Sequence, residues 1–158
     1  MRELILLRHA HAEPASSGQS DMDRPLSPEG LAEAEAAGRW LAEHKLIPDR
    51  VLCSPARRTR ETVESVLAAV GYVDQRLDEG IYEGTPGVLA ELADNHRDAD
   101  RLLLVGHNPG LEHLAALMHS GQSGDYRGMP PGGIVVLALP AEAAIEPGIA
   151  TLSAFWSP

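Results

Sequence analysis

The sequence predicts an α/β protein, a single domain with three layers in which helices cover both faces of a mostly parallel sheet. Short apolar runs alternate along the chain with segments of helical periodicity, and this order is typical of doubly wound sheets. Two of the runs, at residues 4–7 and 102–105, are wholly aliphatic and suit strands that are buried on both faces. The 158 residues match the usual size of one domain, so we expect one unit over 1–158.

Composition and charge exclude several classes of function. With 44% hydrophobic and 23% charged residues, the chain has the make-up of a soluble globular protein. Its formal net charge of −10, with 13 Lys and Arg residues spread along the chain, argues against nucleic-acid and anionic-membrane partners. One cysteine rules out an internal disulfide, and the first residues contain no secretion signal, so a cytoplasmic location is expected.

Strand and helix signals follow one another along the whole chain. In chain order we expect a strand at 4–7, a loop at 13–25, a helix from 28 towards 44, a strand at 51–53, a helix from 55 to 70, a helix from 86, a strand at 101–105, a helix from 109, a surface loop at 121–133, and two late strands at 134–139 and 149–156. The late strands can form an antiparallel edge, with Leu152, Ala154 and Trp156 alternating onto one face.

The predicted helix starts share one signal. Ser27-Pro28, Ser54-Pro55 and Thr85-Pro86 each place a capping hydroxyl before a proline at the first helical position. Asn108 is the expected cap of the fourth helix. Together, these predicted helix starts give the chain a repeating order of strand, turn and helix.

Two histidines occupy matching positions at the ends of predicted strands. His9 follows the first aliphatic run and Arg8, and His107 follows the second run and Gly106. Open α/β sheets bind ligands at the carboxyl ends of their strands, so we expect both histidines at one edge of the sheet. The histidines of helical segments are interpreted as surface or packing residues: His44, His96, His113 and His119.

Arginines at the start of the predicted second helix indicate an anion. Arg57 and Arg58 fall in its first turn, where the helix dipole disfavours positive side chains and attracts anions. Helical spacing lets Arg57 pair with Glu61 on the solvent side, whereas Arg58 shares the inner side with Thr62. We therefore expect Arg58 to point inward, towards a negatively charged ligand.

Two histidines and inward arginines are suited to phosphoryl transfer. The guanidinium fork matches phosphate oxygens, and its charge stabilises a phosphoryl group in transfer. A neutral imidazole can attack phosphorus and hold the phosphoryl group as a covalent intermediate. This chemistry requires no metal, and the chain has neither a His-Glu-x-x-His helix nor paired cysteines for zinc. We therefore expect no metal and no other cofactor.

Other chemistries fit the residues less well. A cysteine phosphatase loop would need an arginine six residues after Cys53, and Thr59 stands there, so Cys53 is interpreted as a buried strand residue. A Gly-x4-Gly-Lys-[Ser/Thr] nucleotide loop is absent. His9 and His11 would share a face as metal ligands only if the first strand continued into the loop, whose composition indicates that it does not.

Four motifs in order span nearly the whole chain: Arg8-His9-Ala10, Asp21-Met22-Asp23-Arg24-Pro25-Leu26-Ser27, Ser54-Pro55-x-x-Arg58-x-x-x-Thr62 and Gly106-His107-Asn108-Pro109. In this combination they resemble the histidine phosphatase superfamily, and most closely its short branch of SixA-type phosphohistidine phosphatases. The resemblance implies a phosphoglycerate mutase-like fold with His9 as the phosphorylated nucleophile. It also implies that Arg8, Arg58 and His107 complete the phosphate pocket.

The sequence offers two candidates for a general acid. Larger members of the family protonate the leaving oxygen with a carboxylate, and Leu77-Asp78-Glu79 resembles the segment that supplies it, which makes Glu79 the first candidate. Asp21, in the loop after the nucleophile, is its rival. An imidazole that leaves from phosphohistidine needs little help from an acid, so the role can also be absent.

The resemblance and the short chain together predict a metal-independent phosphatase that acts on phosphohistidine in a protein, such as a histidine phosphotransfer domain. Relatives that act on sugar phosphates or phosphoglycerate generally carry helical insertions over the pocket, and this chain has little room for them. Hydrolysis of a small phosphomonoester is the first alternative. A phosphate-binding or interaction module without turnover is the second.

Overall fold

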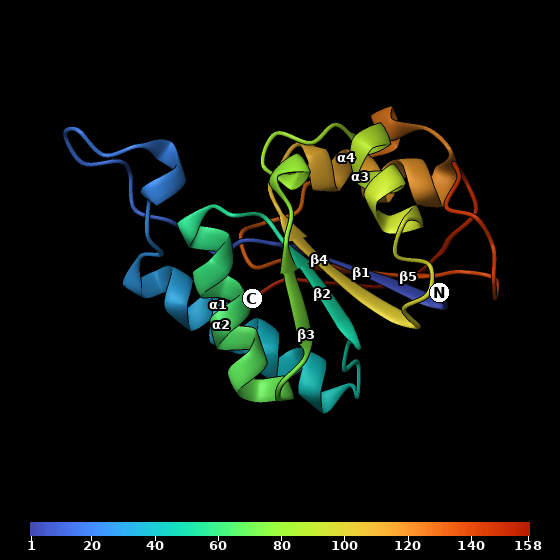
Figure 1. Cartoon of the computed structure of the whole chain (residues 1–158), viewed down its shortest axis with the longest axis horizontal. Coiled ribbons are helices and arrows are strands. Elements are labelled where there is room, and N and C mark those ends of the chain that lie inside the picture. The colour runs from blue at the N-terminus through green and yellow to red at the C-terminus, as the bar shows by residue number, and fades with distance from the viewer.

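Six strands form one sheet in the computed structural model, which describes residues 1–158 (Figure 1). The elements in chain order are β1 (Glu3–Arg8), the short 3-10 helix η1 (Asp21–Asp23), α1 (Pro28–Glu43), β2 (Arg50–Cys53), α2 (Arg57–Val70), β3 (Asp74–Leu77), η2 (Glu79–Ile81), α3 (Pro86–Asp94), β4 (Arg101–Gly106), α4 (Gly110–Ser120), η3 (Ser123–Asp125), β5 (Ile134–Ala138) and β6 (Thr151–Trp156).

The strands lie side by side in the order β3-β2-β4-β1-β5-β6. β2 pairs in parallel with β3 and β4, and β4 pairs in parallel with β1, whereas β5 runs antiparallel to both β1 and β6. The predicted α/β class, with a mostly parallel sheet and an antiparallel edge, is confirmed. Arg8 lies opposite Gly106 in the β1–β4 register, so His9 and His107 leave the sheet as neighbours.

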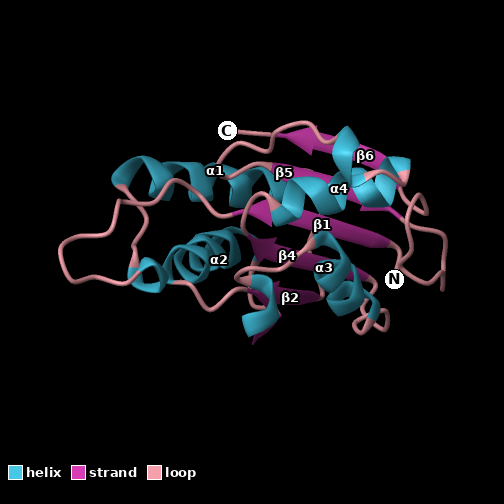
Figure 2. Ribbon diagram, turned by 90° about the horizontal axis from the view of Figure 1, so that it is seen from above, coloured by secondary structure: helices cyan, strands magenta, loops and turns pink.

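Each face of the sheet packs against its own pair of helices, α1 and α2 on one side and α3 and α4 on the other (Figure 1). Figure 2 shows α3 and α4 in front of the strands, on one face of the sheet. Leu4 and Leu6 of β1 belong to the core under α3 and α4, whereas Ile5 and Leu7 belong to the core under α1 and α2. Because successive side chains of a strand point to opposite faces, an unbroken aliphatic run is what a strand between two helical layers requires.

Two of the predicted helix starts are confirmed in detail. The Ser27 hydroxyl accepts a hydrogen bond from Gly30 N at 3.0 Å at the start of α1. Thr85 Oγ1 accepts one from Val88 N at 3.2 Å at the start of α3. In both helices proline follows the cap, where its missing N–H removes no helical hydrogen bond.

The other two predicted caps have different outcomes. The cap at Ser54 is wrong: α2 begins at Arg57 with Ala56 as its N-cap, and the Ser54 hydroxyl accepts from Ala56 N at 3.2 Å in a turn before the helix. The N-cap position of α4 is Pro109, one residue later than expected. Asn108 Oδ1 nevertheless accepts from Glu112 N at 3.3 Å in the first turn of α4, so its side chain caps the helix as predicted.

The edges of the sheet depart from the sequence prediction. β3 was not predicted, because Asp74–Leu77 carries no apolar pattern and all four of its residues are exposed. The two late strands are confirmed, but the register between β5 and β6 shifts after Val136. The shift places Leu152 in the core under α3 and α4 and Ala154 and Trp156 on the opposite face, so the expectation that the three share one face is wrong.

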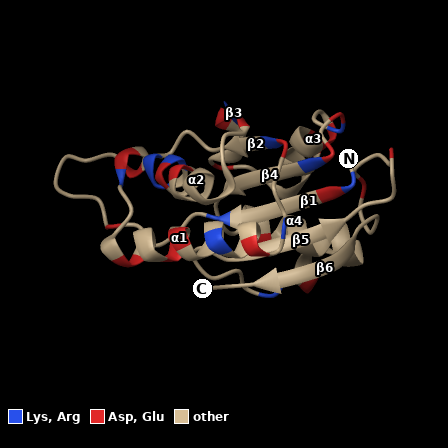
Figure 3. Cartoon of the chain, turned by 90° about the horizontal axis from the view of Figure 1, so that it is seen from below, with Lys and Arg blue, Asp and Glu red and all other residues tan.

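The surface carries charges of both signs, and Figure 3 shows basic and acidic residues mixed along α2. None of the helices combines the length and the apolar composition that crossing a bilayer requires.

Candidate active site

A cleft opens at the carboxyl ends of β1 and β4. Its lining includes the four residues that the sequence assigned to phosphate binding and nucleophilic attack, together with others from the loops around them: Arg8, His9, Asp21, Arg24, Arg58, Tyr82, Glu83, His107 and Asn108. The rings of His9 and His107 are 5.1 Å apart between centroids. The parallel pairing of two strands thus brings together residues that are far apart in the chain.

One ring nitrogen of His9 is committed to the backbone. His9 Nδ1 lies 2.7 Å from the carbonyl oxygen of Ala10, and because a carbonyl can only accept, Nδ1 carries the proton. Nε2 therefore keeps its lone pair. The pKa of His9 is lowered to about 4, chiefly by burial. The hydrogen bond to Ala10 raises the pKa, and the positive charges of Arg58 and Arg8 lower it. The imidazole is neutral at physiological pH, which is the state a nucleophile needs.

This low pKa predicts activity well into the acidic range. Protonation of Nε2 removes the lone pair, and the protonated form of His9 dominates only below a pKa of about 4. We expect kcat/KM, corrected for ionisation of the substrate, to fall as the pH drops through about 4 and not through the ordinary value of 6.5. An acidic limb near the ordinary value in the free enzyme would contradict this state of His9.

His107 is held between an arginine and a serine. Its Nε2 lies 2.7 Å from the Ser54 hydroxyl, and its Nδ1 lies 3.4 Å from Arg58 Nη2. Arginine can only donate, so in this arrangement Nδ1 accepts and Nε2–H donates to Ser54. Burial lowers the pKa of His107 to about 3, and the neighbouring His9 and Arg58 lower it further. The unliganded cleft therefore contains two neutral histidines.

Ser54 is a site residue that the sequence prediction missed, since it was interpreted as a helix cap. Its side chain is fully buried and accepts from Ala56 N while contacting His107. A signal was present, because Ser54 directly follows β2 and so occupies the same strand-end position as His9 and His107. Ser54 links the start of the Arg58 helix to His107.

Replacing Ser54 by alanine is expected to lower both stability and activity. The change leaves a buried His107 nitrogen without a partner, which costs about 1–3 kcal/mol. We expect the free energy of unfolding in urea to fall by about that amount and kcat/KM to fall roughly tenfold, because the His107 ring loses its anchor. Ser153→Ala, on the exposed edge of β6, is the control. Wild-type values for Ser54→Ala would show that the contact has no role.

Arg58 points inward, as its helical position predicts. Its residue is only 6% exposed, and its Nη1 and Nη2 donate to the backbone oxygen and to Oδ2 of Asp21 at 2.7 and 3.1 Å. Arg57 instead pairs with Glu61 at 3.2 Å. The Nε atoms of Arg8 and Arg58 are buried without a hydrogen-bond partner. Both arginines line the cleft, and neither uses all of its donors within the protein.

Comparison with known proteins identifies the family. Residues 4–119 match the model of the histidine phosphatase superfamily, branch 1. The chain belongs to the histidine phosphatase superfamily.

Relatives of this histidine phosphatase cover its whole length. An uncharacterized protein of Mycobacterium tuberculosis is 37% identical over 159 residues, which are 94% of this chain and 98% of the relative. A solved structure of a candidate phosphohistidine phosphatase SixA from Agrobacterium tumefaciens is 29% identical with a TM-score of 0.85, covering 99% of this chain and 98% of that one. A second candidate SixA structure, from Nakamurella multipartitia, is 31% identical with a TM-score of 0.84, covering 99% and 96%. The SixA resemblance and the phosphoglycerate mutase-like fold are confirmed.

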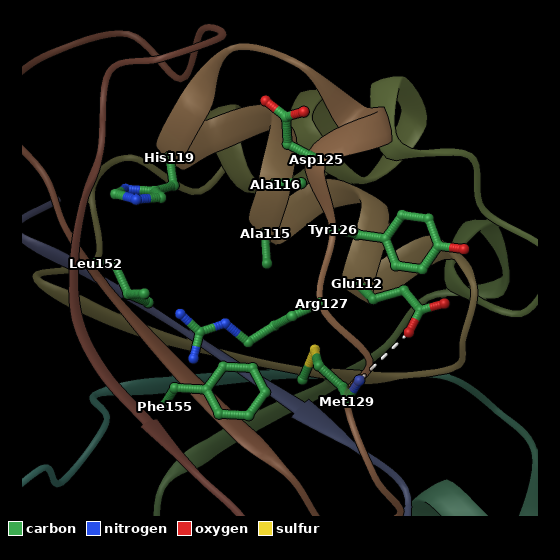
Figure 4. A pocket seen from close by; sticks show the side chains of 10 residues that line it. All are labelled: Glu112, Ala115, Ala116, His119, Asp125, Tyr126, Arg127, Met129, Leu152 and Phe155. Carbon is green, nitrogen blue, oxygen red and sulfur yellow. Dashed lines mark hydrogen bonds between the residues drawn. The ribbon is translucent and has the colours of Figure 1, made fainter.

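The loop at 121–133 of this histidine phosphatase does more than connect two elements on the surface. Met129 is 2% exposed, and its carbonyl oxygen accepts from Arg8 Nη1 at 2.8 Å and from Asn108 Nδ2 at 2.9 Å. Met129 N donates to Glu112 Oε2 at 3.3 Å, the dashed bond in Figure 4. The loop thus holds the guanidinium of Arg8 through the Met129 carbonyl. No local sequence pattern predicts this contact.

Of the two predicted acids, Asp21 lines the cleft and Glu79 does not. Glu79 is exposed and is not among the residues that line the cleft, because the turn of η2 brings Glu83 there instead. Glu83 makes no hydrogen bond or ion pair with another side chain. The structure thus places Glu83, which the sequence prediction missed, where Glu79 was expected.

Asp21 lies in the cleft but is already engaged. It accepts hydrogen bonds from the Tyr82 hydroxyl, from Arg24 Nη1 at 2.9 Å and from Arg58. The bonds from Tyr82 and Arg24, with that from Arg58, hold the pKa of Asp21 well below its usual range. A carboxylate that stays ionised in this way has no proton to donate, which weakens Asp21 as a general acid.

The described chain contains no group of three or more His, Cys, Asp or Glu side chains placed to hold a metal ion. His9, His11 and Glu13 accordingly do not form a cluster, since His11 Nδ1 lies 2.7 Å from the Ser27 hydroxyl at the start of α1.

Proposed function

We propose that this histidine phosphatase transfers the phosphoryl group of its substrate to Nε2 of His9 and then to water. The observation that carries the proposal is the bond from His9 Nδ1 to the Ala10 carbonyl, which leaves an unprotonated Nε2 in a cleft lined by arginines. In the first step the bond between Nε2 and phosphorus forms, and the bond from phosphorus to the leaving group breaks. In the second step water attacks phosphorus, the P–N bond breaks and inorganic phosphate leaves.

The arginines and His107 would stabilise the phosphoryl group in both steps. Arg8 and Arg58 are held by Met129 and Asp21, so their donors are oriented before substrate binds. A bound phosphate dianion would favour a proton on His107, which could then donate to a phosphate oxygen. Ser54 remains a partner for Nε2 of His107 in either case, because the added proton goes to Nδ1 and the hydroxyl accepts from Nε2–H in both states.

Glu83 is our candidate for the group that handles the leaving atom of an oxygen ester. It is the carboxylate of the cleft that is not bound to arginine, so its oxygens are not already occupied as those of Asp21 are. It would protonate the leaving oxygen in the first step and accept a proton from the attacking water in the second. An imidazole leaving group from phosphohistidine would depend on it less.

We propose phosphohistidine in a protein as the substrate, with a small phosphomonoester as the alternative. Support comes from the two structural relatives at 29% and 31% identity, which are candidate phosphohistidine phosphatases. The cleft is lined mainly by loop residues, together with Asp21 of η1, the last residue of β1 and one residue from the first turn of α2, which suits a side chain presented by a partner. The test is a comparison of kcat/KM on a phosphorylated histidine phosphotransfer protein and on p-nitrophenyl phosphate. Faster turnover of the protein supports the proposal, and faster turnover of the ester favours the alternative. Phosphate binding without turnover of either would indicate the non-catalytic module.

Activity is expected to survive metal removal. The proposed steps use only imidazole, guanidinium and carboxylate groups, so dialysis against EDTA should leave kcat/KM unchanged. The measurement is the rate before and after dialysis, with added Mg²⁺ and Zn²⁺ as comparisons. Loss of activity that one of these ions restores would contradict the metal-independent mechanism.

A further inference from the structure

The catalytic cleft continues into a second groove. The two share four lining residues, Tyr82, Glu83, His107 and Asn108, and the second groove runs on between the segment that leads into α3 and the start of α4. A substrate whose phosphate lies beside His9 can therefore extend its other half along this groove.

The two ends of the combined groove differ in charge. The phosphate end contains Arg8, Arg24 and Arg58. The second groove is lined by no lysine or arginine, and its one carboxylate is Glu83. Its other lining residues include no aspartate. The groove is thus positive where phosphate binds and negative where the rest of the substrate would lie.

The arginines at the mouth do not offset this polarity. Arg24 is bound to Asp21 at 2.9 Å and to the Glu13 carbonyl at 2.8 Å, and Arg58 is bound to Asp21 at 3.1 Å. Asp21 offsets one of these two positive charges, and the remaining positive charge lies with Arg8 at the phosphate end. In the second groove, which no lysine or arginine lines, a second negative group on a substrate would meet Glu83.

We propose that Glu83 selects substrates by the charge of the leaving group, favouring a cationic or neutral group and disfavouring one that carries a carboxylate. This selection rests on the proposed function, because it assumes that phosphate binds beside His9. A leaving imidazole satisfies it, since a ring that is protonated before or during departure takes the electron pair of the P–N bond and leaves as neutral imidazole. Phosphorylated hydroxy acids do not satisfy it, because their carboxylate would lie near the like charge of Glu83, which no lysine or arginine of the second groove offsets.

Phosphoethanolamine and phosphoglycolate test the selection, because both place a single charge two carbons from the ester oxygen, positive in one and negative in the other. Each is added as a competitor of p-nitrophenyl phosphate hydrolysis, and the ratio of the two inhibition constants is the readout. We expect the wild type to bind phosphoethanolamine about tenfold more tightly, as one charge pair at a solvated site allows. Glu83→Gln should remove most of this ratio, and Glu83→Lys should invert it. Raising the salt concentration should reduce the wild-type ratio.

Glu79→Gln is the matched control, since Glu79 is an exposed glutamate of the same segment that does not line the groove. It should leave the ratio unchanged. An unchanged ratio in Glu83→Gln, or no preference in the wild type, would overturn the selection while leaving the phosphatase proposal intact.

If the wild type hydrolyses neither p-nitrophenyl phosphate nor phosphohistidine, the proposed function fails. Calorimetric titration of the same two ligands onto the protein then still decides whether Glu83 discriminates between their charges.

Discussion

Replacement of His9 by alanine is expected to abolish turnover while leaving the protein folded. The change removes the nitrogen that would form the covalent bond to phosphorus, and nucleophile removal typically costs at least about 10³-fold in rate. His9 is only partly buried, and the one hydrogen bond of its side chain is to the carbonyl of the next residue, so the sheet and helices should be unaffected. The measurements are kcat/KM on p-nitrophenyl phosphate and on phosphohistidine, together with circular dichroism and urea unfolding.

A second readout reports the intermediate itself. Wild-type protein quenched during turnover should carry an acid-labile phosphoryl group, as a phosphoimidazole does, and His9→Ala should carry none. His44→Ala is the matched control. His44 is exposed at the end of α1, where its ring bonds to the carbonyl of Trp40 and stacks on the Trp40 side chain in the same helix. Undiminished turnover by His9→Ala, or equal phosphoryl labelling of the wild type and His9→Ala, would contradict the assignment of His9 as nucleophile.

Replacement of Arg58 by alanine is expected to have the second largest effect. The guanidinium would stabilise phosphate charge in the transition state, and loss of one such oriented donor typically costs about 10²–10³-fold in kcat. The change also releases Asp21, whose backbone and side-chain oxygens Arg58 now holds at 2.7 and 3.1 Å. We therefore expect KM to rise along with the fall in kcat. Arg58→Lys should recover only part of the loss, because an ammonium cannot reproduce the planar fork.

Arg57→Ala provides the control on the same helix turn. Arg57 pairs with Glu61 outside the cleft, and exposed pairs of this kind contribute at most about 1 kcal/mol to stability. Its removal should leave kcat within about twofold of the wild-type value. Equal losses in Arg57→Ala and Arg58→Ala would mean that the whole helix start matters and not the inward guanidinium.

Local sequence patterns predicted the framework of the site. The aliphatic runs at 4–7 and 102–105 identified the two central strands, because only strands covered on both faces lack polar alternation. The residues after those runs, His9 and His107, were then expected at one sheet edge. Helical spacing alone separated Arg58 from Arg57, since an angle of roughly 100° per residue turns one inward when the other faces solvent.

Contacts between distant segments were beyond local patterns. The carbonyl of Met129 holds Arg8 across 121 positions of the chain, and the Tyr82 hydroxyl reaches Asp21 across 61. Glu83 replaces Glu79 in the cleft because the short turn of η2 rotates the segment, and a turn of three residues leaves no periodicity in the sequence. The register shift in β5 and β6 likewise has no local marker.

The sequence by itself determined the five strands with buried or half-buried side chains, the helical layers and the histidines and arginine that meet at the strand ends, because burial leaves a recognisable pattern of apolar residues in a strand or helix. Only the tertiary structure decided the protonated nitrogen of His9, the role of Ser54, the support of Arg8 by Met129 and the carboxylate that faces the cleft. These depend on single hydrogen bonds and turn angles between segments brought together by folding, and such contacts leave no repeating pattern in the chain.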